Sequence, residues 1–188
     1  MMKIYQANIV PLNAEAIGTS AHGQALFVVN GNQLVVTIEM FDTPANQQHW
    51  EHFHGFPDGR PAAIATMAQD TNHDGFVDLP ETEPVSGTTM VPFNDTPETM
   101  DIPNDEYPIA DANGHFSYTK IVPLETLDAQ FKQVFNDSEL ALDQRVIYIH
   151  GVANSLKIPA TVAGEVATYD AHVTLPIAVG KIERLTLD

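Results

Sequence analysis

The chain is organised around residues 48–59, which read Gln48-His49-Trp50-Glu51-His52-Phe53-His54-Gly55-Phe56-Pro57-Asp58-Gly59 and hold three of the eight histidines. The aromatic residues in this stretch favour a β-strand, and residues two apart on a strand point to the same face. His52 and His54 therefore project together, and their imidazoles can bind one metal ion. His49 falls on the opposite face. The alternative for a His-x-His pair taken alone is an ordinary pair of surface histidines.

Length and composition limit the class of protein. A chain of 188 residues fits a single domain, residues 1–188, with a substantial core. Eight Lys and Arg against 25 Asp and Glu give a formal net charge of −17, which repels nucleic acid and anionic membrane surfaces and attracts cations. There is no cysteine, so a metal site must use histidine, carboxylate, amide or carbonyl ligands.

The sequence contains no segment that reads as a membrane span or a signal peptide. No apolar run approaches the roughly 18 residues of a membrane helix, and the opening residues 1–6 lack the apolar core of a signal peptide. Either the protein is cytosolic or a signal segment has been removed. Because strong acidity suits solubility outside the cell, we expect an extracytoplasmic protein: periplasmic, secreted or surface-anchored.

Strand patterns dominate the rest of the chain. Residues 25–29 and 33–40 flank Asn30-Gly31-Asn32, a hairpin signal. Several strands separated by turns predict an all-β sandwich or barrel with one or two short helices. The further expected elements are strands at residues 115–120, 145–151 and 172–182 and helices at residues 61–69 and 123–136.

Residues 70–81 match a calcium-binding loop position for position. Oxygen-bearing side chains stand at loop positions 1, 3, 5, 9 and 12, a backbone carbonyl is expected at position 7, and Gly75 permits the turn at position 6. The predicted calcium ligands are Asp70, Asn72, Asp74, the Phe76 carbonyl, Asp78 and Glu81. The alternative is an acidic surface loop stabilised by its own Asx turns.

Prolines shape the expectation for the residues after the loop. Pro80, Pro84 and Ser86-Gly87 predict no regular helix there, so we expect a lone calcium insertion of structural role, with an entering helix at most. Residues 82–110 contain five prolines. They predict a long ordered loop that the ion ties down, since untethered loops of that length are uncommon in compact domains.

In their order along the chain these pieces resemble the copper/zinc superoxide dismutase fold and its relative, the chordin-type (CHRD) domain. The resemblance implies a Greek-key β-sandwich or barrel. It also implies that His52, His54 and His150 bind copper, while His49 supports a copper ligand through a hydrogen bond. The matching pieces are the hairpin at Asn30-Gly31, the stretch His49 to His54, the turn Ala110 to Gly114, the strand Arg145 to Gly151 and the segment Ala178 to Ile182.

The chain departs from that family in ways that bear on activity. The family's zinc loop is rich in histidine, but between residues 55 and 110 this chain has only His73, and the calcium loop takes that place. Leu175-Pro176-Ile177 stands where the active-site arginine is expected, and Arg184 comes too late to replace it. Without that cation, and with a net charge of −17, superoxide is weakly attracted. Efficient dismutation is not expected.

The leading hypothesis is therefore a copper-binding, superoxide dismutase-like protein with a structural calcium loop, acting on superoxide or another small redox substrate if it is an enzyme. The alternatives are a copper storage or transfer protein and a non-enzymatic, calcium-stabilised extracellular adhesion module. The fourth copper ligand is open between His73, His115 and His172, and His22 is expected to be solvated.

Overall fold

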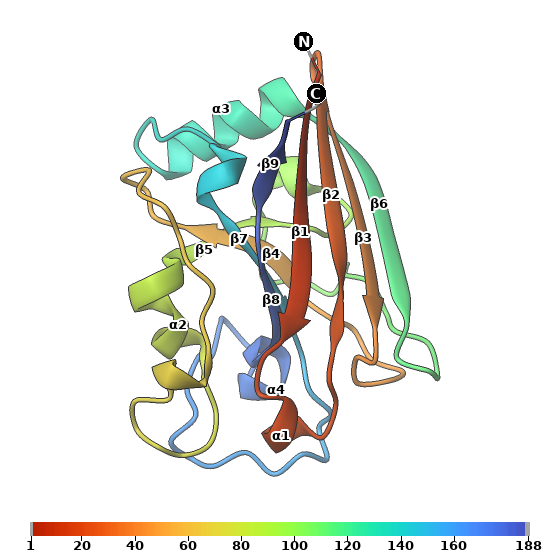
Figure 1. Cartoon of the computed structure of the whole chain (residues 1–188), viewed down its shortest axis with the longest axis vertical. Helices are drawn as coiled ribbons and strands as arrows, with labels where there is room; N and C mark the ends of the chain where they lie inside the picture. The colour runs from red at the N-terminus through yellow and green to blue at the C-terminus, as the bar shows by residue number, and fades with distance from the viewer. Residues whose placement is uncertain (1, 187–188) are drawn as a thin grey trace.

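The computed structural model describes residues 2–186, so both ends of the predicted domain lie outside the described residues. Nine strands form one curled antiparallel sheet in the order β5-β4-β7-β8-β1-β2-β3-β6, with β9 beside β1 (Figure 1). This confirms the expected all-β class. The strands are β1 (Lys3–Pro11), β2 (His22–Asn30), β3 (Gln33–Phe41), β4 (Glu51–Gly55), β5 (Thr88–Pro92), β6 (Phe116–Pro123), β7 (Val146–His150), β8 (Pro176–Lys181) and β9 (Glu183–Leu185).

Helices are few and short. The α-helices are α1 (Ala14–Ile17), α2 (Leu79–Ser86), α3 (Leu124–Val134) and α4 (Ala171–Thr174), and the 3₁₀ turns are η1 (Met67–Gln69), η2 (Pro97–Thr99) and η3 (Leu142–Gln144). None of the helices within residues 2–186 has the length and apolar character to cross a membrane.

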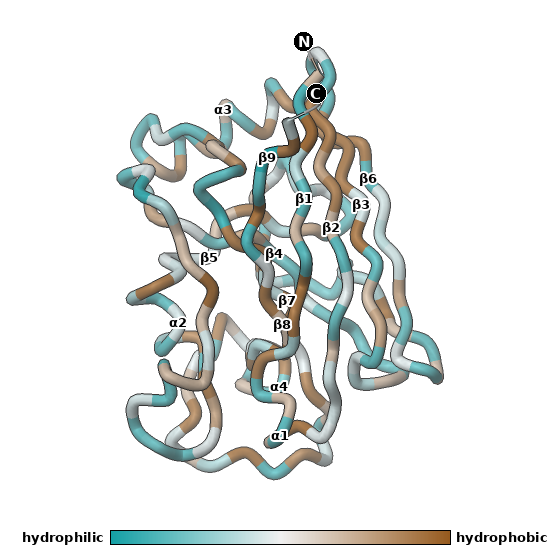
Figure 2. The backbone as a smooth tube through the Cα atoms, in the orientation of Figure 1, coloured by the Kyte–Doolittle hydropathy of each residue, from teal (hydrophilic) through white to brown (hydrophobic). Residues whose placement is uncertain are grey.

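Strand β1 joins the two halves of the sheet. Residues 3–9 pair with β2, whereas Val10 and Pro11 pair with β8. The half formed by β1, β2, β3 and β6 thus curls over the half formed by β8, β7, β4 and β5 (Figure 1). The main core fills the space between them, and hydropathy alternates along the paired strands (Figure 2). Alternation is the pattern of strands that bury one face.

The second half of the sheet is buried on both faces. Ile147 and Ile149 of β7 enter the main core, while Val146 and Tyr148 enter a second apolar cluster. Residues 56–85 supply most of the partners on this second face, including Ala62, Ala65 and Val77. Because Phe53 of β4 points into the main core, strand alternation turns its neighbours His52 and His54 toward the second face.

Arg145 holds the start of β7 to the segments around it. Its side chain is fully buried and donates hydrogen bonds to the carbonyl oxygens of Glu139, Leu140 and Phe56 at 2.7–2.9 Å. The guanidinium carries five N–H donors in a fixed fork, so one side chain can satisfy three carbonyls at once. Burial lowers the pKa of Arg145 from its ordinary value.

The helix predicted at residues 61–69 is wrong. Residues 61–66 are irregular, and only the turn η1 follows. The backbone N–H of Ala62 donates to Gln144 and that of Ala63 to Val85, so tertiary pairing overrides the helix propensity of this alanine-rich stretch.

The opposite correction applies after the acidic loop, where α2 forms although no regular helix was expected. Asp78 caps α2 and shares a capping box with Glu81. Pro80 lies in the first turn, where its missing N–H costs nothing. Only Pro84 removes a bond that the helix would otherwise make.

Strand predictions failed mainly where pairing is long-range. Strands β1, β5 and β9 were not predicted, and β5 interrupts the expected loop at residues 82–110. A strand was expected at residues 172–182. Helix α4 covers the start of this range, and strand β8 begins only at Pro176. Helix α3 confirms the helix predicted after Pro123; Leu127 and Phe131 are buried on it, and Val134 is 53% exposed.

We expect Arg145→Lys to destabilise the fold. A single ammonium cannot reach all three carbonyls, and each buried acceptor left without a donor costs about 1–3 kcal/mol. The free energy of unfolding, measured by urea denaturation, should fall by roughly 3 kcal/mol. The control is Arg184→Lys on exposed β9, where the change should stay within about 0.5 kcal/mol. Equal, small effects of both changes would contradict the anchoring role.

Candidate metal centre

Pairing of β4 with β7 brings three histidines together. His52 lies opposite Tyr148 in the register, and the N–H of His150 donates to the carbonyl of Trp50 at 2.8 Å, which extends the pairing to the end of β7. One ring nitrogen from each of His52, His54 and His150 lies within 4.8 Å of the others. All three side chains are at most 2% exposed. The predicted histidine set is therefore brought together in one buried cluster.

Hydrogen bonds fix which nitrogen is free on two of the rings. Nδ1 of His150 lies 2.7 Å from the carbonyl oxygen of Thr174. A carbonyl only accepts, so Nδ1 carries the proton and Nε2 is bare. The Tyr107 hydroxyl donates to the carbonyl of Ile102 and lies 2.9 Å from Nε2 of His52. It must accept from that nitrogen, which leaves Nδ1 of His52 bare.

The third ring completes a set of unpartnered nitrogens. Nε2 of His54 lies 3.3 Å from the Thr89 hydroxyl, and its Nδ1 has no partner. Nδ1 of His52 and Nε2 of His150 are likewise buried without a partner. Buried polar atoms are hydrogen-bonded in the great majority of cases. A metal ion would satisfy one such nitrogen on each ring of the cluster.

Burial also keeps these rings in the form that binds metals. It is the main cause that lowers the pKa of His52 and His54 well below the ordinary value, and His150 lowers both further, whereas a backbone hydrogen bond at Gly87 opposes the shift of His54. Burial lowers the pKa of His150 to about 4, against the opposing effect of its hydrogen bond to Thr174. Neutral imidazole is the ligand form, so the cluster is ready for a cation at neutral pH.

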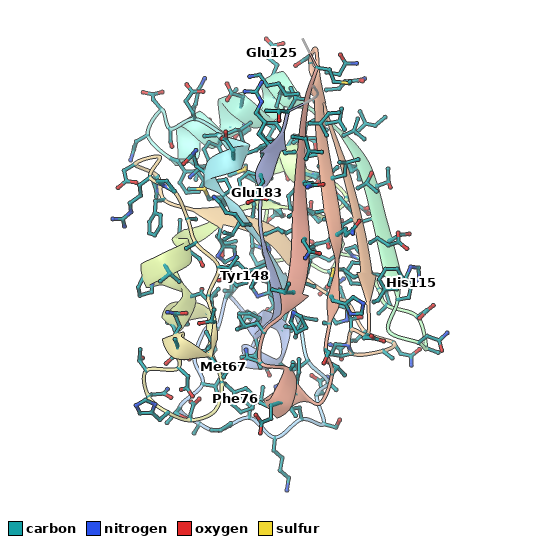
Figure 3. All side chains as sticks on the ribbon, viewed as in Figure 1. Met67, Phe76, His115, Glu125, Tyr148 and Glu183 are labelled. Atoms are coloured by element: carbon teal, nitrogen blue, oxygen red, sulfur yellow. The ribbon has the colours of Figure 1, made fainter. Side chains whose placement is uncertain are left out.

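No fourth histidine or carboxylate ligand joins the cluster within residues 2–186. His73 is exposed in the acidic loop, at φ 60°. His115 bonds to Glu39 on the other half of the sheet and lies far from Tyr148, which packs against His54 (Figure 3). Nε2 of His172 donates to the carbonyl of Leu156 at 2.9 Å. None of the three candidates for a fourth ligand is in place.

His49 lies behind the cluster rather than in it. Its Nδ1 is 2.9 Å from the backbone carbonyl of His150, and its Nε2 is 2.8 Å from that of Pro44. Burial lowers its pKa, while its contacts with the two carbonyls raise it; the neutral ring has one N–H and donates to one of the two carbonyls. His49 thus holds the main chain at the end of β7, whereas Thr174 orients the ring of His150.

Two groups next to the cluster were not predicted. Tyr107 fixes the ring of His52 from the proline-rich loop; its sequence signal is an aromatic residue between two prolines in a polar stretch. Glu51 points away from the histidines, is fully buried, and has no partner for either carboxylate oxygen. Burial raises its pKa well above the ordinary value, which favours the uncharged form.

The acidic loop at residues 70–81 is hydrophilic along most of its length (Figure 2) and satisfies its oxygens internally. The carboxylate of Asp70 accepts from the N–H groups of Asp74 and Gly75, and Oε1 of Glu81 accepts from the N–H and hydroxyl of Thr71. The loop's carboxylates do not converge within 4.8 Å as the histidine cluster does. The oxygen donors suit calcium, but calcium would have to draw them inward.

This loop is also hydrogen-bonded to the segment formed by residues 157–170. The hydroxyl of Thr161 donates to Asp74 at 2.6 Å, and the N–H of Ala163 donates to Asp78 at 2.7 Å. Despite partial burial, hydrogen bonds from Thr161 and from the loop lower the pKa of Asp74, whereas burial raises that of Asp78. Leu79, next to Asp78 in the sequence, and Val166, three residues after Ala163, line a small cavity beside the histidines.

Metal-free protein should lose stability as the pH falls from about 6.5 to about 4. Because the folded pKa of His150 lies below its unfolded value, the unfolded chain binds a proton that the folded chain refuses, and the free energy of unfolding falls with pH. His150→Gln should give a shallower fall in urea titrations at pH 7, 6 and 5. His22→Gln, at an exposed histidine, is the control. A fall as steep in His150→Gln as in the unchanged chain would contradict this assignment.

Comparison with known proteins assigns no family to this site. No protein-family model matches the chain, and no curated protein matches its sequence. The function therefore rests on the geometry of the histidine cluster and on the loops that enclose it.

Proposed function

We propose that the chain binds one copper ion through His52, His54 and His150. The observation that carries this proposal is a buried cluster in which one ring nitrogen of each histidine lies within 4.8 Å of the others, and in which each ring has a nitrogen without a partner. Imidazole suits copper, zinc, iron and nickel. Copper(II) heads the order of affinity of divalent first-row ions for a given nitrogen site, which favours copper for an all-imidazole site without thiolates or carboxylates.

We further propose that the fold is the Greek-key sandwich of a superoxide dismutase-like or chordin-type domain. Long connections return β6 to pair with β3 and β7 to pair with β4. Returns of this kind are typical of Greek keys, which most β-sandwiches contain. The metal-binding histidines come from β4 and β7, in agreement with the order of pieces in the sequence.

Slow or absent turnover of superoxide is part of the proposal. The small cavity beside His52 and His150 has no lysine or arginine in its lining, and the chain carries a net charge of −17. Neither would attract an anion. Copper storage or transfer is the second candidate, favoured by histidines at most 2% exposed, since an enclosed ion is retained better than it is reached.

Residues 70–81 are proposed as a structural calcium site. The supporting observations are Gly75 at φ 90° at loop position 6 and helix α2, which starts directly after position 9. Because the carboxylates already have hydrogen-bond partners, calcium binding must break bonds such as Thr71 to Glu81. That cost suits the weak, millimolar affinities of extracellular calcium modules, in keeping with the proposed extracytoplasmic location.

Copper binding is tested on metal-free protein made without an affinity tag. We expect about one Cu(II) per chain with nitrogen ligands in the electron paramagnetic resonance (EPR) spectrum. His54→Ala should lower the affinity by orders of magnitude, because it leaves two imidazoles.

The matched control is His22→Ala, at an exposed histidine outside the cluster, which should bind copper normally. Equal loss from both changes, or copper binding that survives His52→Ala combined with His150→Ala, would contradict the site. Superoxide turnover by the copper-loaded protein near the diffusional limit of about 10⁸–10⁹ M⁻¹s⁻¹ would contradict the proposed absence of efficient catalysis.

Calcium should raise the melting temperature by several degrees at millimolar concentration, and chelator should reverse the shift. A ligand that binds only the folded state stabilises it by about 2.7 kcal/mol at a hundredfold excess over Kd. Asp70→Ala with Glu81→Ala should abolish the response. Glu125→Ala with Glu183→Ala removes the same charge from exposed positions elsewhere and should retain it. Calcium-free protein whose melting ignores calcium would show that the loop is stabilised by its own hydrogen bonds alone.

A further inference from the structure

A small cavity lies beside the histidine cluster. Its volume is about 20 Å³, and it touches His52 and His150 but not His54. About 10–15 Å³ of such volume admits one water molecule, so the space accepts a single water-sized particle. The remaining lining residues are Trp50, Leu79, Thr89, Ile102, Val166 and Thr174.

Trp50 lines this cavity and carries an unused hydrogen-bond donor. Its side chain is 2% exposed, and its Nε1 is buried without a partner. The indole is held by Tyr107, stacked at 5.4 Å between ring centroids, and by Tyr169, whose ring packs at 4.7 Å. An indole N–H can only donate, and leaving it unpaired in the interior is costly.

The unpartnered atoms around the cavity are of two kinds. The bare nitrogens of His52 and His150 suit a cation, but a cation cannot satisfy the N–H of Trp50. That donor needs an acceptor. Three neutral imidazoles also leave the charge of a bound cation uncompensated, and a buried charge is costly unless it is paired. A small anion next to the metal would meet both needs.

We propose that Trp50 selects the ligand at the open position of the metal: a water-sized anion that accepts a hydrogen bond from the indole N–H. Leu79, Ile102 and Val166 also line the cavity, whose volume of about 20 Å³ leaves room for one water-sized ligand. This inference rests on the proposed metal site and deepens it. Fluoride, which is close to water in size and accepts hydrogen bonds, is the probe, and three-atom azide is the size control.

The first test uses the single tryptophan of the chain. In protein loaded with diamagnetic Zn(II), the one indole N–H signal in a nitrogen–proton NMR spectrum should shift in a saturable way with fluoride and show coupling to fluorine. Azide at the same concentration should cause no saturable shift. An indole signal indifferent to fluoride in metal-loaded protein, or azide that binds as tightly as fluoride, would overturn the proposal.

The second test compares variants loaded with Cu(II), using fluorine splitting in the EPR spectrum to follow fluoride binding. Trp50→Phe should weaken fluoride binding about tenfold or more while copper affinity changes little. Tyr169→Phe, which alters the other neighbour of the indole, is the control and should keep fluoride affinity. Unchanged fluoride binding in Trp50→Phe would overturn the role of the indole. If Trp50→Phe does not fold, the NMR test decides. Failure of the unchanged chain to bind any metal would overturn the proposed function and this inference with it.

Discussion

The site depends on the antiparallel pairing of β4 with β7, two five-residue strands buried on both faces. Alternation sends Phe53 and Ile149 into the main core and the histidines to the other face. A slip of one residue would exchange the two faces and place imidazoles among apolar side chains. Packing of the core therefore sets the register, and the register assembles the metal ligands. A register shift between Phe53 and His54 in the pairing with β5 is the local irregularity at this point, of the kind that re-aims side chains next to functional sites.

The sequence could predict those parts of the arrangement that depend on residues close together in the chain. The His-x-His spacing, the hairpin at Asn30-Gly31 and helix α3 are local patterns, and each is present. Strand β5 has only five residues, and it is defined as a strand by its pairing with β4. Helix α2 formed despite two prolines because Asp78 and Glu81 cap it. Tyr107 and Thr174, which orient two of the ligand rings, act across 55 and 24 residues of chain, and no local pattern encodes contacts at such separations.

The histidine cluster and the acidic loop share one wall. Leu79 lines the cavity and directly follows Asp78, whose carboxylate accepts the N–H of Ala163. Val166, three residues further on, lines the same cavity. A movement of the Asp78 carboxylate would therefore shift Leu79 directly and Val166 through Ala163, and both of these residues line the cavity beside His52 and His150. In the second apolar cluster, residues 62–77 pack against Tyr148 of β7, and this packing holds the segment before α2 against the sheet.

The net charge of the chain affects how often cations and anions reach the site, whereas burial affects how strongly a bound ion is held. A net charge of −17 raises the local concentration of cations and lowers that of anions, so the field favours metal loading and disfavours repeated encounter with an anionic substrate. In the proposed site, an ion inside the cavity would be screened far less by salt than at the surface, and a small anion beside the metal would be held by the charge of the metal and by the indole of Trp50. Such an arrangement would favour retention of an ion over its rapid exchange, which suits the proposed ion-holding role better than fast catalysis.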